Sequence, residues 1–574
     1  MDRTGPVAGQ RRQSVPLWQR AWLNLYPCDV PSSLPYPNVP ISALLETAAR
    51  RHPRRTACTI YNRATSYEAL SEQAHRLARG LADLGAGPGR RVAMLLPNMP
   101  EYIVALQAAW LTGATVLQLS PLMVPEELQK WLTATDCHIA VTLDLLAPGL
   151  MPAMKRGPLE HLVVTSLAKR LVFWKGLLYR AERLRRYGGL RLRPSGHWHR
   201  FDHLAQANPR SLSPRIVPEE DVALMVPTGG TTASPKIVQL THRNLVANAF
   251  QLHAWSRQND LPVNVLGVLP FFHAYGLSVC LLTSLVGDWA IHLYPRFDPE
   301  AVLNLLVKYH IEMVPAVPAM LAAFNRVLRQ KPRDLSFIHT VICGASALDK
   351  AVRDDFEKYG ADKVVEGYGL SEASPVTHVN PIDRALNKPG TIGLPLPDTE
   401  AKIMDQDTGQ EEVPVGTVGE LVVRGPQVMK GYFNNPTETD RALRNGWLYT
   451  GDLARCDQDG YFTIVDRKKD IIKTSGFLVF PAEVEEVLKR FPDVAEAAVI
   501  AVPDAERGEI VKALVVPRNG CLDRAALERH CAGHLSKHKR PRQLEIVKEL
   551  PKNFLGKIQR RRLRESTNGN GQAH

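Results

Sequence analysis

The sequence lacks a long apolar run, paired cysteines and an N-terminal leader, and each absence excludes a class of protein. The longest apolar stretch, from Ala274 to Val286, is too short to span a bilayer. Residues 1–16 are polar and contain arginine, without the apolar centre of a signal peptide. The eight cysteines are scattered singly, with no CxxC pair and no zinc-binding spacing. We therefore expect a cytoplasmic protein whose thiols stay reduced.

Length and composition indicate an ordinary globular protein with more than one domain. The chain has 574 residues, of which 45% are hydrophobic and 22% are charged. A single hydrophobic core does not organise a chain of this length, so at least two domains are expected. The net charge is +13, but no recognised nucleic-acid module accompanies it. We therefore expect no nucleic-acid partner.

The positive charge is concentrated between residues 168 and 193. This segment holds nine basic side chains and one acidic one, a net charge of +8, with Leu, Phe, Trp and Tyr between them. A basic amphipathic segment with aromatic residues is typical of proteins that lie on an anionic membrane. A solvated insertion, whose side-chain stems pack on the protein body, is the alternative. Membrane association through residues 168–193 is thus one of two expectations.

Short apolar runs alternate with helical patterns over the first 150 residues and again beyond the basic segment. Strands are predicted at 57–61, 91–96, 114–119, 138–143 and 222–226, and helices at 66–85, 101–113 and 245–256. Such alternation is typical of largely parallel sheets with crossover helices. From Thr399 onward, turns and short strands replace it. After Lys469 a compact α+β pattern follows.

These patterns predict an α/β fold with two domains. The first, residues 1–468, would combine mixed and parallel sheets, crossover helices and a small β-barrel-like part. The second, residues 469–565, would be a small, mobile α+β domain. The last residues, 566–574, are rich in Asn and Gly and are expected to be disordered.

A glycine- and hydroxyl-rich turn, "VPTGGTTASPK", runs from Val226 to Lys236 between two apolar runs. Its backbone amides can form an anion nest, to which the threonine hydroxyls and the lysine add donors. It is not a GxxxxGK[ST] loop, because Pro235 precedes the lysine and Ile237 follows it. Taken alone, the turn is compatible with phosphate binding and with a mobile surface turn.

Three further segments follow this turn along the chain. "EGYGLSEASP" places Glu372 just after a tight Gly-Tyr-Gly turn. The segment from residue 446 to 477 is turn-rich and offers Asp452, Arg467, Lys469 and Lys473. "LPKNFLGKIQRRRL" presents Lys557 after a glycine. Each segment alone is also compatible with a solvated turn or a surface run of charges. Together with the glycine-rich turn they make four segments, and their occurrence in this order is specific for one kind of protein.

With these four segments, the sequence resembles the adenylate-forming superfamily of acyl-CoA synthetases, peptide-synthetase adenylation domains and luciferases. The resemblance covers about Pro40 to Leu563. "DRKKDIIKTSGF" and the segment "VPISALLETAARRHP" are most similar to long-chain fatty acyl-CoA synthetases. The resemblance implies an AMP-forming acid-thiol ligase. Such an enzyme converts a carboxylic acid and ATP, with Mg²⁺, to acyl-AMP and pyrophosphate, and then exchanges AMP for coenzyme A.

The resemblance also implies nucleotide-binding roles for residues at matching positions. The β- and γ-phosphates would be surrounded by Thr228, Gly229, Gly230, Thr231, Thr232 and Lys236. Adenine would be flanked by Gly344, Ala345, Tyr368 and Gly369. Asp452 would accept the ribose hydroxyls, and Arg467 would add a donor there. Glu372 would hold Mg²⁺, a hard cation that prefers oxygen ligands, and Ser371 stands where threonine is usual.

The remaining implied roles concern the acyl group and coenzyme A. Lys557 would reach the carboxylate and the α-phosphate and stabilise charge in the adenylation transition state. His273 would gate the acyl carboxylate, its alternative being a satisfied core histidine. Lys469 would be the hinge about which the small domain rotates. After rotation Lys473, with Ser475, Gly476 and Phe477, would face the coenzyme A tunnel.

Two positions depart from the family's phosphate loop, which usually has glycine where this chain has Ala233 and Ile237. Glycine there can supply a positive φ, and a Cβ costs roughly 1–2 kcal/mol in that conformation. A β-branched residue is the worse outlier. We hypothesise that adenylation is impaired while thioester formation survives, and in the extreme case that a partner ligase supplies the acyl-AMP. If both residues have negative φ, the loop tolerates them.

Other functions stay open at this stage. The chain ends soon after Lys557, without a carrier domain, but loading of a separate carrier protein is compatible with the sequence. A luciferase and a non-catalytic acyl-adenylate or membrane-binding protein are further alternatives. The acid itself is undetermined among fatty, aromatic and polycyclic acids, with the long-chain resemblance favouring a large apolar one. Relatives are often dimers, so a homodimer is one expectation.

Overall fold

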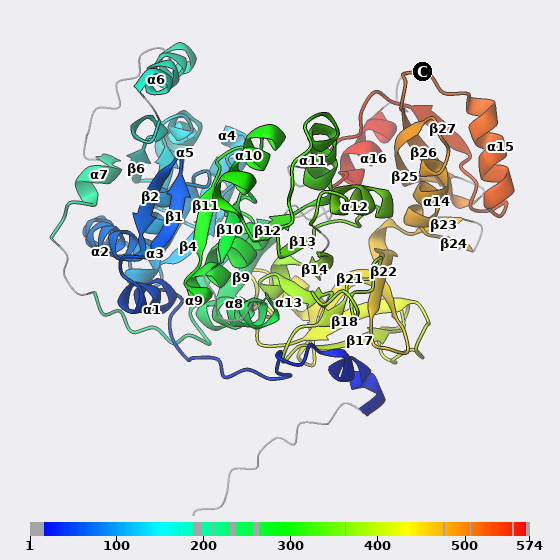
Figure 1. Ribbon diagram of the computed structural model, residues 1–574, viewed down its shortest axis with the longest axis horizontal. Helices are drawn as coiled ribbons and strands as arrows, with labels where there is room; N and C mark the ends of the chain where they lie inside the picture. Colours follow the sequence, from blue (N-terminus) through cyan, green and yellow to red (C-terminus); the bar gives the residue numbers. More distant parts are fainter. Residues whose placement is uncertain are drawn as a thin grey trace, which may run out of the picture.

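The computed structural model describes residues 17–569 of the chain, except 172, 188–196, 209–211, 229–235, 257–262, 362, 475–476, 505–506 and 554–555. A large part, drawn in blue to yellow, carries a smaller part in orange and red at one end (Figure 1). The α/β fold with a large first domain and a small α+β second domain is confirmed.

An eight-stranded sheet forms one layer of the large part, in the order β19-β9-β8-β4-β3-β5-β6-β7. Its strands are β3 (Arg91–Leu95), β4 (Thr115–Gln118), β5 (Ile139–Leu143), β6 (His161–Thr165), β7 (Trp198–Arg200), β8 (Val222–Thr228), β9 (Lys236–Thr241) and β19 (Gly431–Tyr432). Strands β3 to β8 pair in parallel, whereas β8-β9 and β9-β19 are antiparallel. The antiparallel edge carries the glycine-rich turn between β8 and β9.

A nine-stranded sheet forms the second layer, in the order β16-β15-β14-β13-β12-β10-β11-β1-β2. Its strands are β1 (Thr56–Ile60), β2 (Arg63–Ser66), β10 (Asn264–Gly267), β11 (Ala290–Leu293), β12 (Met313–Ala316), β13 (Thr340–Cys343), β14 (Val364–Gly369), β15 (Val376–Val379) and β16 (Leu394–Pro395). The middle strands are parallel and β14-β15-β16 are antiparallel. The expected mixed sheets are thus present.

Helices cover both sheets, and one of them is buried along its whole length. Every residue of α3 (Pro100–Leu111) is buried, which explains its lack of an exposed polar face. The other helices of the large part are α1 (Ala43–Arg51), α2 (Tyr67–Asp83), α4 (Pro125–Ala134), α5 (Met151–Arg156), α7 (Phe201–Leu204), α8 (His242–Ser256), α10 (Pro299–Tyr309), α11 (Pro318–Gln330), α12 (Lys350–Glu357) and α13 (Pro436–Ala442), with short 3-10 turns η1 (Leu17–Leu25), η2 (Ala147–Leu150) and η5 (Ser371–Ala373).

The longest apolar run of the sequence is an interior helix. It forms the wide π-helical η4 (Gly276–Leu282), followed by α9 (Thr283–Gly287). All seven residues of η4 are buried, and Ser278 within it donates to the carbonyl of Ser374, at 2.5 Å. Among the described residues, no helix is both long enough and apolar enough to cross a membrane.

A five-stranded antiparallel sheet stands where the small barrel-like part is expected. Its strands are β17 (Glu400–Met404), β18 (Gly419–Arg424), β20 (Leu443–Arg444), β21 (Trp447–Cys456) and β22 (Phe462–Arg467). They pair along an open path, with β20 and β22 both on β21. Trp22 of η1 packs edge-on against Phe462, with ring centroids 6.2 Å apart.

The small part is an α+β unit with its own core. A sheet in the order β24-β23-β26-β25, with β27 on β26, packs against α14 (Pro481–Lys489) and α15 (Arg524–His534). Its strands are β23 (Ile472–Thr474), β24 (Phe477–Val479), β25 (Val494–Asp504), β26 (Gly508–Pro517) and β27 (Gln543–Ile546). The predicted boundary at residues 468 and 469 falls in the 3-10 turn η6 (Lys468–Asp470).

The chain ends in α16 (Arg560–Gly569), which differs from the sequence expectation. Residues 566–569 were expected to begin a disordered tail and instead continue this helix, whereas 570–574 lie outside the described residues. The first turns of α16 are fixed to the small part, because Leu563 is buried and Arg564 pairs with Asp470 at 2.7 Å. A helix nucleated in this way adds further residues at little cost.

The basic segment forms η3 (Leu167–Lys169) and α6 (Phe173–Tyr187), and α6 lies at the periphery of the large part (Figure 1). Arg170 pairs with Glu101 at 2.8 Å, and Arg183 pairs with Asp144 at 3.2 Å. Leu177 and Leu178 are 48% and 62% exposed. The segment is therefore docked by some of its cations and presents two leucines to the outside.

Candidate active site

Three side chains from the strands β14, β21 and β22 meet at the predicted ribose site. Asp452 on β21 accepts a hydrogen bond from the hydroxyl of Tyr368, 2.6 Å from Oδ2, and its Oδ1 lies 3.0 Å from Nε of Arg467. Asp452 and Arg467 are direct neighbours in the β21-β22 ladder. A carboxylate has about four acceptor positions, so Asp452 has capacity left for two ribose hydroxyls.

Charge and burial reinforce this cluster. Asp452 is buried, and its carboxylate raises the pKa of the Arg467 guanidinium. Burial, and then the neighbouring Asp452, raise the pKa of Tyr368 well above its ordinary value. Tyr368 therefore stays a neutral hydrogen-bond donor and Arg467 stays a cation at any physiological pH.

The predicted adenine-flanking turn follows β13. The amide of Gly344 donates to the carbonyl of Ala316, and a Cβ on Gly344 would lie 3.3 Å from the carbonyl of Gly367 and from the Tyr275 hydroxyl. Ala345 has a φ of 73°, a left-handed conformation that costs an alanine free energy. Backbone strain of this kind is concentrated at functional sites.

Lys557 reaches this site from the small part. Its ammonium lies close enough to Arg467, Lys469 and Asp452 for their charges to affect it, and burial together with the two cations lowers its pKa to about 8. The preceding Gly556 has a φ of +78°, and a Cβ there would lie 2.9 Å from Cβ of Ala319 on α11. The loop carrying Lys557 thus rests directly against the large part.

His273, the predicted gate of the acyl carboxylate, lies within range of the charge of Lys557. Burial, and then the ammonium of Lys557, lower the pKa of His273 to about 4. Its Nδ1 lies 3.2 Å from the amide nitrogen of Tyr275. The imidazole is therefore neutral at pH 7, which suits a gate that borders an apolar group.

The predicted hinge lysine lies between two anchored neighbours. Lys468 pairs with Glu420 of the small antiparallel sheet at 2.7 Å. Asp470 pairs with Arg564 of α16 at 2.7 Å. Lys469 itself is exposed. One neighbour is thus tied to the large part and the other to the small part, with the predicted hinge residue between them.

The predicted phosphate lysine is held by a side chain that sequence reasoning missed. Nζ of Lys236 lies 2.5 Å from a carboxylate oxygen of Glu438 on α13 and 4.7 Å from the ring centroid of Tyr432. Tyr432 donates its hydroxyl to Oε1 of Glu372 at 2.9 Å. Tyr432 therefore touches both the predicted phosphate lysine and the predicted metal ligand.

Glu372 fits the role of a Mg²⁺ ligand. It lies in η5, half-buried, and its backbone carbonyl accepts from the amide of Met429 at 2.8 Å. Protein sites for Mg²⁺ commonly supply one or two carboxylates and leave the remaining positions to water and substrate phosphates. The described residues contain no cluster of three or more metal-ligating side chains, so only a site of this sparse kind is compatible with them.

Part of the phosphate loop lies outside the described residues, namely Gly229, Gly230, Thr231, Thr232 and the departing Ala233. Thr228 ends β8 and donates to the backbone carbonyl of Lys236 at 3.3 Å. Ile237 is buried within β9 and opposite Pro227, and it is not among the residues with positive φ. The backbone strain proposed for Ile237 is therefore wrong, because a β-branched residue is favoured in an extended strand.

The predicted coenzyme A residues lie on the β23-β24 hairpin of the small part. Lys473 is exposed, and Phe477 is 55% exposed with its ring 4.6 Å from that of His538. Ser475 and Gly476 lie outside the described residues. The structure thus brings Lys557 to the predicted nucleotide site, whereas Lys473 of the hairpin is exposed.

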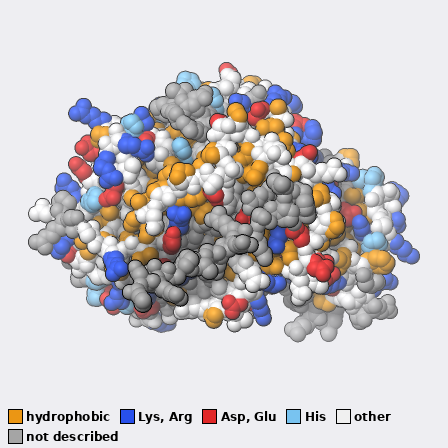
Figure 2. All heavy atoms as spheres, turned by 90° about the horizontal axis from the view of Figure 1, so that it is seen from below, with side chains coloured by type: hydrophobic (Ala, Val, Ile, Leu, Met, Phe, Trp, Pro, Cys, Tyr) orange, Lys and Arg blue, Asp and Glu red, His pale blue; other side chains and the backbone are white. Residues whose placement is uncertain are grey.

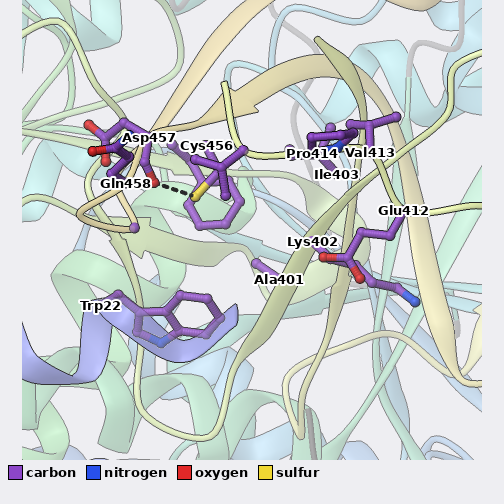
Figure 3. A pocket seen from close by; sticks show the side chains of 13 residues that line it. Trp22, Ala401, Lys402, Ile403, Glu412, Val413, Pro414, Cys456, Asp457 and Gln458 are labelled. Atoms are coloured by element: carbon purple, nitrogen blue, oxygen red, sulfur yellow. Dashed lines mark hydrogen bonds between the residues drawn. The ribbon is translucent and has the colours of Figure 1, made fainter. Parts of the chain in front are cut away.

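A pocket elsewhere in the molecule contains none of these residues. It lies between Trp22 of η1 and the small antiparallel sheet, where Ala401, Ile403, Pro414 and Cys456 face it (Figure 3). Its walls are mostly apolar, although Lys402, Glu412 and Asp457 also line it. The predicted nucleotide site is the better candidate for chemistry, because its charged residues come together from both parts of the molecule.

Fold and site together define a two-domain adenylate-forming enzyme. A model of the family described as "AMP-binding enzyme" matches residues 45–433, and one of the "AMP-binding enzyme C-terminal domain" matches residues 483–557. The chain belongs to the AMP-binding enzyme family.

Several known proteins are similar over nearly the whole chain. The Long-chain-fatty-acid--CoA ligase of Bacillus subtilis is 38% identical over 556 residues, which cover 96% of this chain and 99% of that protein. The Feruloyl-CoA synthase of an Amycolatopsis species is 34% identical over 515 residues, 89% of this chain and 95% of that protein. The solved structure of ATP-bound MatB from Rhodopseudomonas palustris has a TM-score of 0.80 at 28% identity and covers 92% and 99% of the two chains.

Proposed function

We propose that the protein forms acyl-CoA thioesters from a large apolar carboxylic acid, such as a long-chain fatty acid, through an acyl-AMP intermediate. The observation that carries the proposal is the meeting of Lys557 with Asp452, Arg467, Tyr368 and His273, which come from both parts of the molecule. The named ligase of Bacillus subtilis favours a long-chain acid, whereas the feruloyl enzyme supports an aromatic acid as a second candidate.

In the adenylation step, a carboxylate oxygen attacks the α-phosphorus of ATP and pyrophosphate leaves. Asp452 would hold the ribose, and Lys557 would place its ammonium beside the carboxylate and the α-phosphate, where negative charge accumulates. Lys236 would lie at the β- and γ-phosphates. Mg²⁺ held by Glu372 would neutralise charge on the triphosphate. His273, neutral at pH 7, would border the carbonyl carbon end of the acid.

In the thioester step, the thiol sulfur of coenzyme A attacks the acyl carbon and AMP leaves. The small part would rotate at Lys469, withdraw Lys557 and bring the hairpin with Lys473 and Phe477 to the site. The exposure of these two side chains and the anchored neighbours of Lys469 support this exchange.

Two parallel assays test the proposal. One supplies acid, ATP, Mg²⁺ and coenzyme A, and the other supplies synthetic acyl-AMP and coenzyme A, each with a panel of fatty and aromatic acids. We expect thioester in both. Thioester from acyl-AMP alone would favour an acyltransferase fed by a partner ligase, and no thioester with any acid would favour a binding protein. The same assays with carrier proteins in place of coenzyme A test whether a carrier protein is the acyl acceptor instead.

An intact adenylation step is favoured over an impaired one, because Ile237 lies in an extended strand. Ala233 remains the one substitution that could weaken the loop. The variant Ala233→Gly tests it, and we expect less than a threefold change in the rate of acid-dependent pyrophosphate release. A tenfold gain, equivalent to about 1.4 kcal/mol, would restore the hypothesis of impaired adenylation.

We further propose that α6 brings the protein to anionic membranes, where long-chain acids partition. Its exposed leucines and the cations Arg180 and Arg185 lie on the outside of the molecule. On the face seen in Figure 2, basic and acidic side chains are interspersed, so the excess charge is not gathered there. A homodimer stays a prediction, which light scattering of the purified protein tests.

A further inference from the structure

A carboxylate that adenylation does not require lies on the predicted phosphate lysine. Glu438, on the first turn of α13, approaches Nζ of Lys236 to 2.5 Å. The two side chains are only 22% and 18% exposed. The carboxylate of Glu438 also accepts from Arg441 at 2.5 Å. A phosphate oxygen that binds the ammonium of Lys236 must therefore displace the carboxylate of Glu438 or share the ammonium with it. Both groups are negatively charged.

The position of Glu438 is fixed by the backbone around it. Asn435 caps α13 by accepting from the amide of Glu438 at 3.1 Å. One turn on, Thr439 accepts from the amide of Tyr432 at 2.9 Å. Tyr432 belongs to β19, which pairs with β9, the strand that begins with Lys236. Glu438 and Lys236 are thus set opposite each other by the sheet and the helix cap rather than by flexible side chains alone.

Tyr432 keeps the lysine close to the nucleotide site while Glu438 holds it. The ammonium lies over the face of its ring, a favourable position for a cation. The hydroxyl of the same ring donates to Glu372. Lys236 therefore needs only a local shift to exchange one anion for another, since the ring that supports it also borders the predicted metal ligand.

We propose that Glu438 is a built-in competitor of the nucleotide phosphates for Lys236. Pairing with Glu438 weakens the hold of Lys236 on ATP before the reaction and on pyrophosphate after it. A resident carboxylate that recaptures the lysine thereby promotes the release of pyrophosphate. Glu438 acts through Lys236 and is thus a positioning residue. The proposal rests on the proposed function, because it assumes a nucleotide at Lys236.

Equilibrium binding to the purified full chain tests the proposal without any acid. The dissociation constants of ATP and of pyrophosphate, each with Mg²⁺, are measured by calorimetry for the wild type and for Glu438→Gln. We expect both ligands to bind about two- to fivefold more tightly to the variant, the range set by the strength of a partly exposed ion pair. Glu438→Asp, which keeps the charge, should restore most of the wild-type value.

Two further variants separate competition from a structural role. In the Lys236→Met background, the change Glu438→Gln should no longer alter either dissociation constant. The ammonium for which Glu438 and the phosphates would compete is absent from that variant. Arg441→Gln, which removes the other partner of Glu438, should weaken ATP binding slightly by freeing the carboxylate for Lys236. Product inhibition by pyrophosphate should strengthen in Glu438→Gln, with the thioester step from acyl-AMP unchanged.

Each contrary outcome has one meaning. Weaker ATP binding in Glu438→Gln would show that Glu438 presents Lys236 to the phosphates instead of competing for it. Unchanged binding of both ligands would show that the pair is irrelevant to the nucleotide. Either result overturns the proposal while leaving acyl-CoA formation intact. Absence of ATP binding by the wild type would instead overturn the proposed function itself.

Discussion

The ammonium of Lys557 is buried and lies among other cations, and both conditions affect its protonation. Arg467, Lys469 and Arg560 lower its pKa, Asp452 raises it, and burial contributes most, which brings the pKa to about 8. His273 also lies within range of its charge, but with a pKa of about 4 the imidazole does not titrate near neutral pH. The pKa of Lys557 thus lies just above physiological pH.

The rate of adenylation should therefore fall as the pH rises through about 8. The cationic form of Lys557 predominates below this pKa and is lost above it, at up to tenfold per pH unit. Acid-dependent pyrophosphate release between pH 6.5 and 9.5 measures the effect. Lys557→Arg, whose guanidinium stays charged, should flatten the alkaline limb even if its overall rate is lower. An unchanged limb in that variant would assign the titration to another group.

In the proposed mechanism, the short turn η6 controls the second half-reaction. Lys468 is tied to Glu420 in the large part and Asp470 to Arg564 in the small one. Lys469 lies between these two pairs, and the proposed mechanism places the rotation there. We therefore predict that one backbone change at Lys469 separates the two half-reactions.

Lys469→Pro should leave adenylation nearly intact and reduce thioester formation from acyl-AMP at least tenfold. Proline fixes φ near −65° and so opposes the backbone rotation. Lys468→Ala is the matched control, since it breaks the pair with Glu420 without restricting the backbone. Both half-reactions are measured for each variant. An equal loss in both half-reactions of Lys469→Pro would indicate damage to the fold rather than a blocked hinge.

Elements with a clear local pattern could be predicted from the sequence. The alternating runs became β3, β4 and β5, and the amphipathic pattern at 66–85 became α2 (Tyr67–Asp83). The bond from Tyr432 to Glu372 could not be predicted, because 60 residues separate the partners and no local pattern links them. The same holds for Glu438, which reaches Lys236 only after the β19-β9 pairing has formed.

The site was predictable where the chemistry depends on residue type and unpredictable where it depends on backbone conformation. A carboxylate at position 452 and a lysine at 557 sufficed for the expected cluster, and the structure brings them together. Ile237 was misjudged because a glycine in relatives suggested a positive φ, whereas the residue lies in β9. Sequence alone does not determine φ for a residue at the end of a loop, because it does not fix at which residue the following strand begins.

At the scale of the whole molecule, α6 is the feature that points outward. Its docked cations leave Leu177 and Leu178 exposed beside Arg180. Basic residues near an anionic membrane contribute about 1 kcal/mol each, and buried leucines add to this. Reversible binding of this segment to a charged membrane is therefore a prediction.

Vesicle flotation should show binding to anionic phospholipid vesicles at low salt and little binding to neutral ones. Leu177→Asp combined with Leu178→Asp should reduce binding at least fivefold while leaving activity toward a soluble short acid unchanged. Val415→Asp, at a 44% exposed apolar residue away from α6, serves as the matched control. Equal binding by both variants would remove α6 from the membrane contact.

The predicted hinge residue between the two anchors has a consequence for the speed of the enzyme. A whole domain that swings about Lys469 moves through solvent and meets viscous drag, whereas a reaction in a sheltered site does not. Turnover with coenzyme A should then slow as sucrose or glycerol thickens the medium, while the adenylation half-reaction keeps its rate. In that case the rotation of the small part, rather than the chemical steps, would limit the rate of thioester formation.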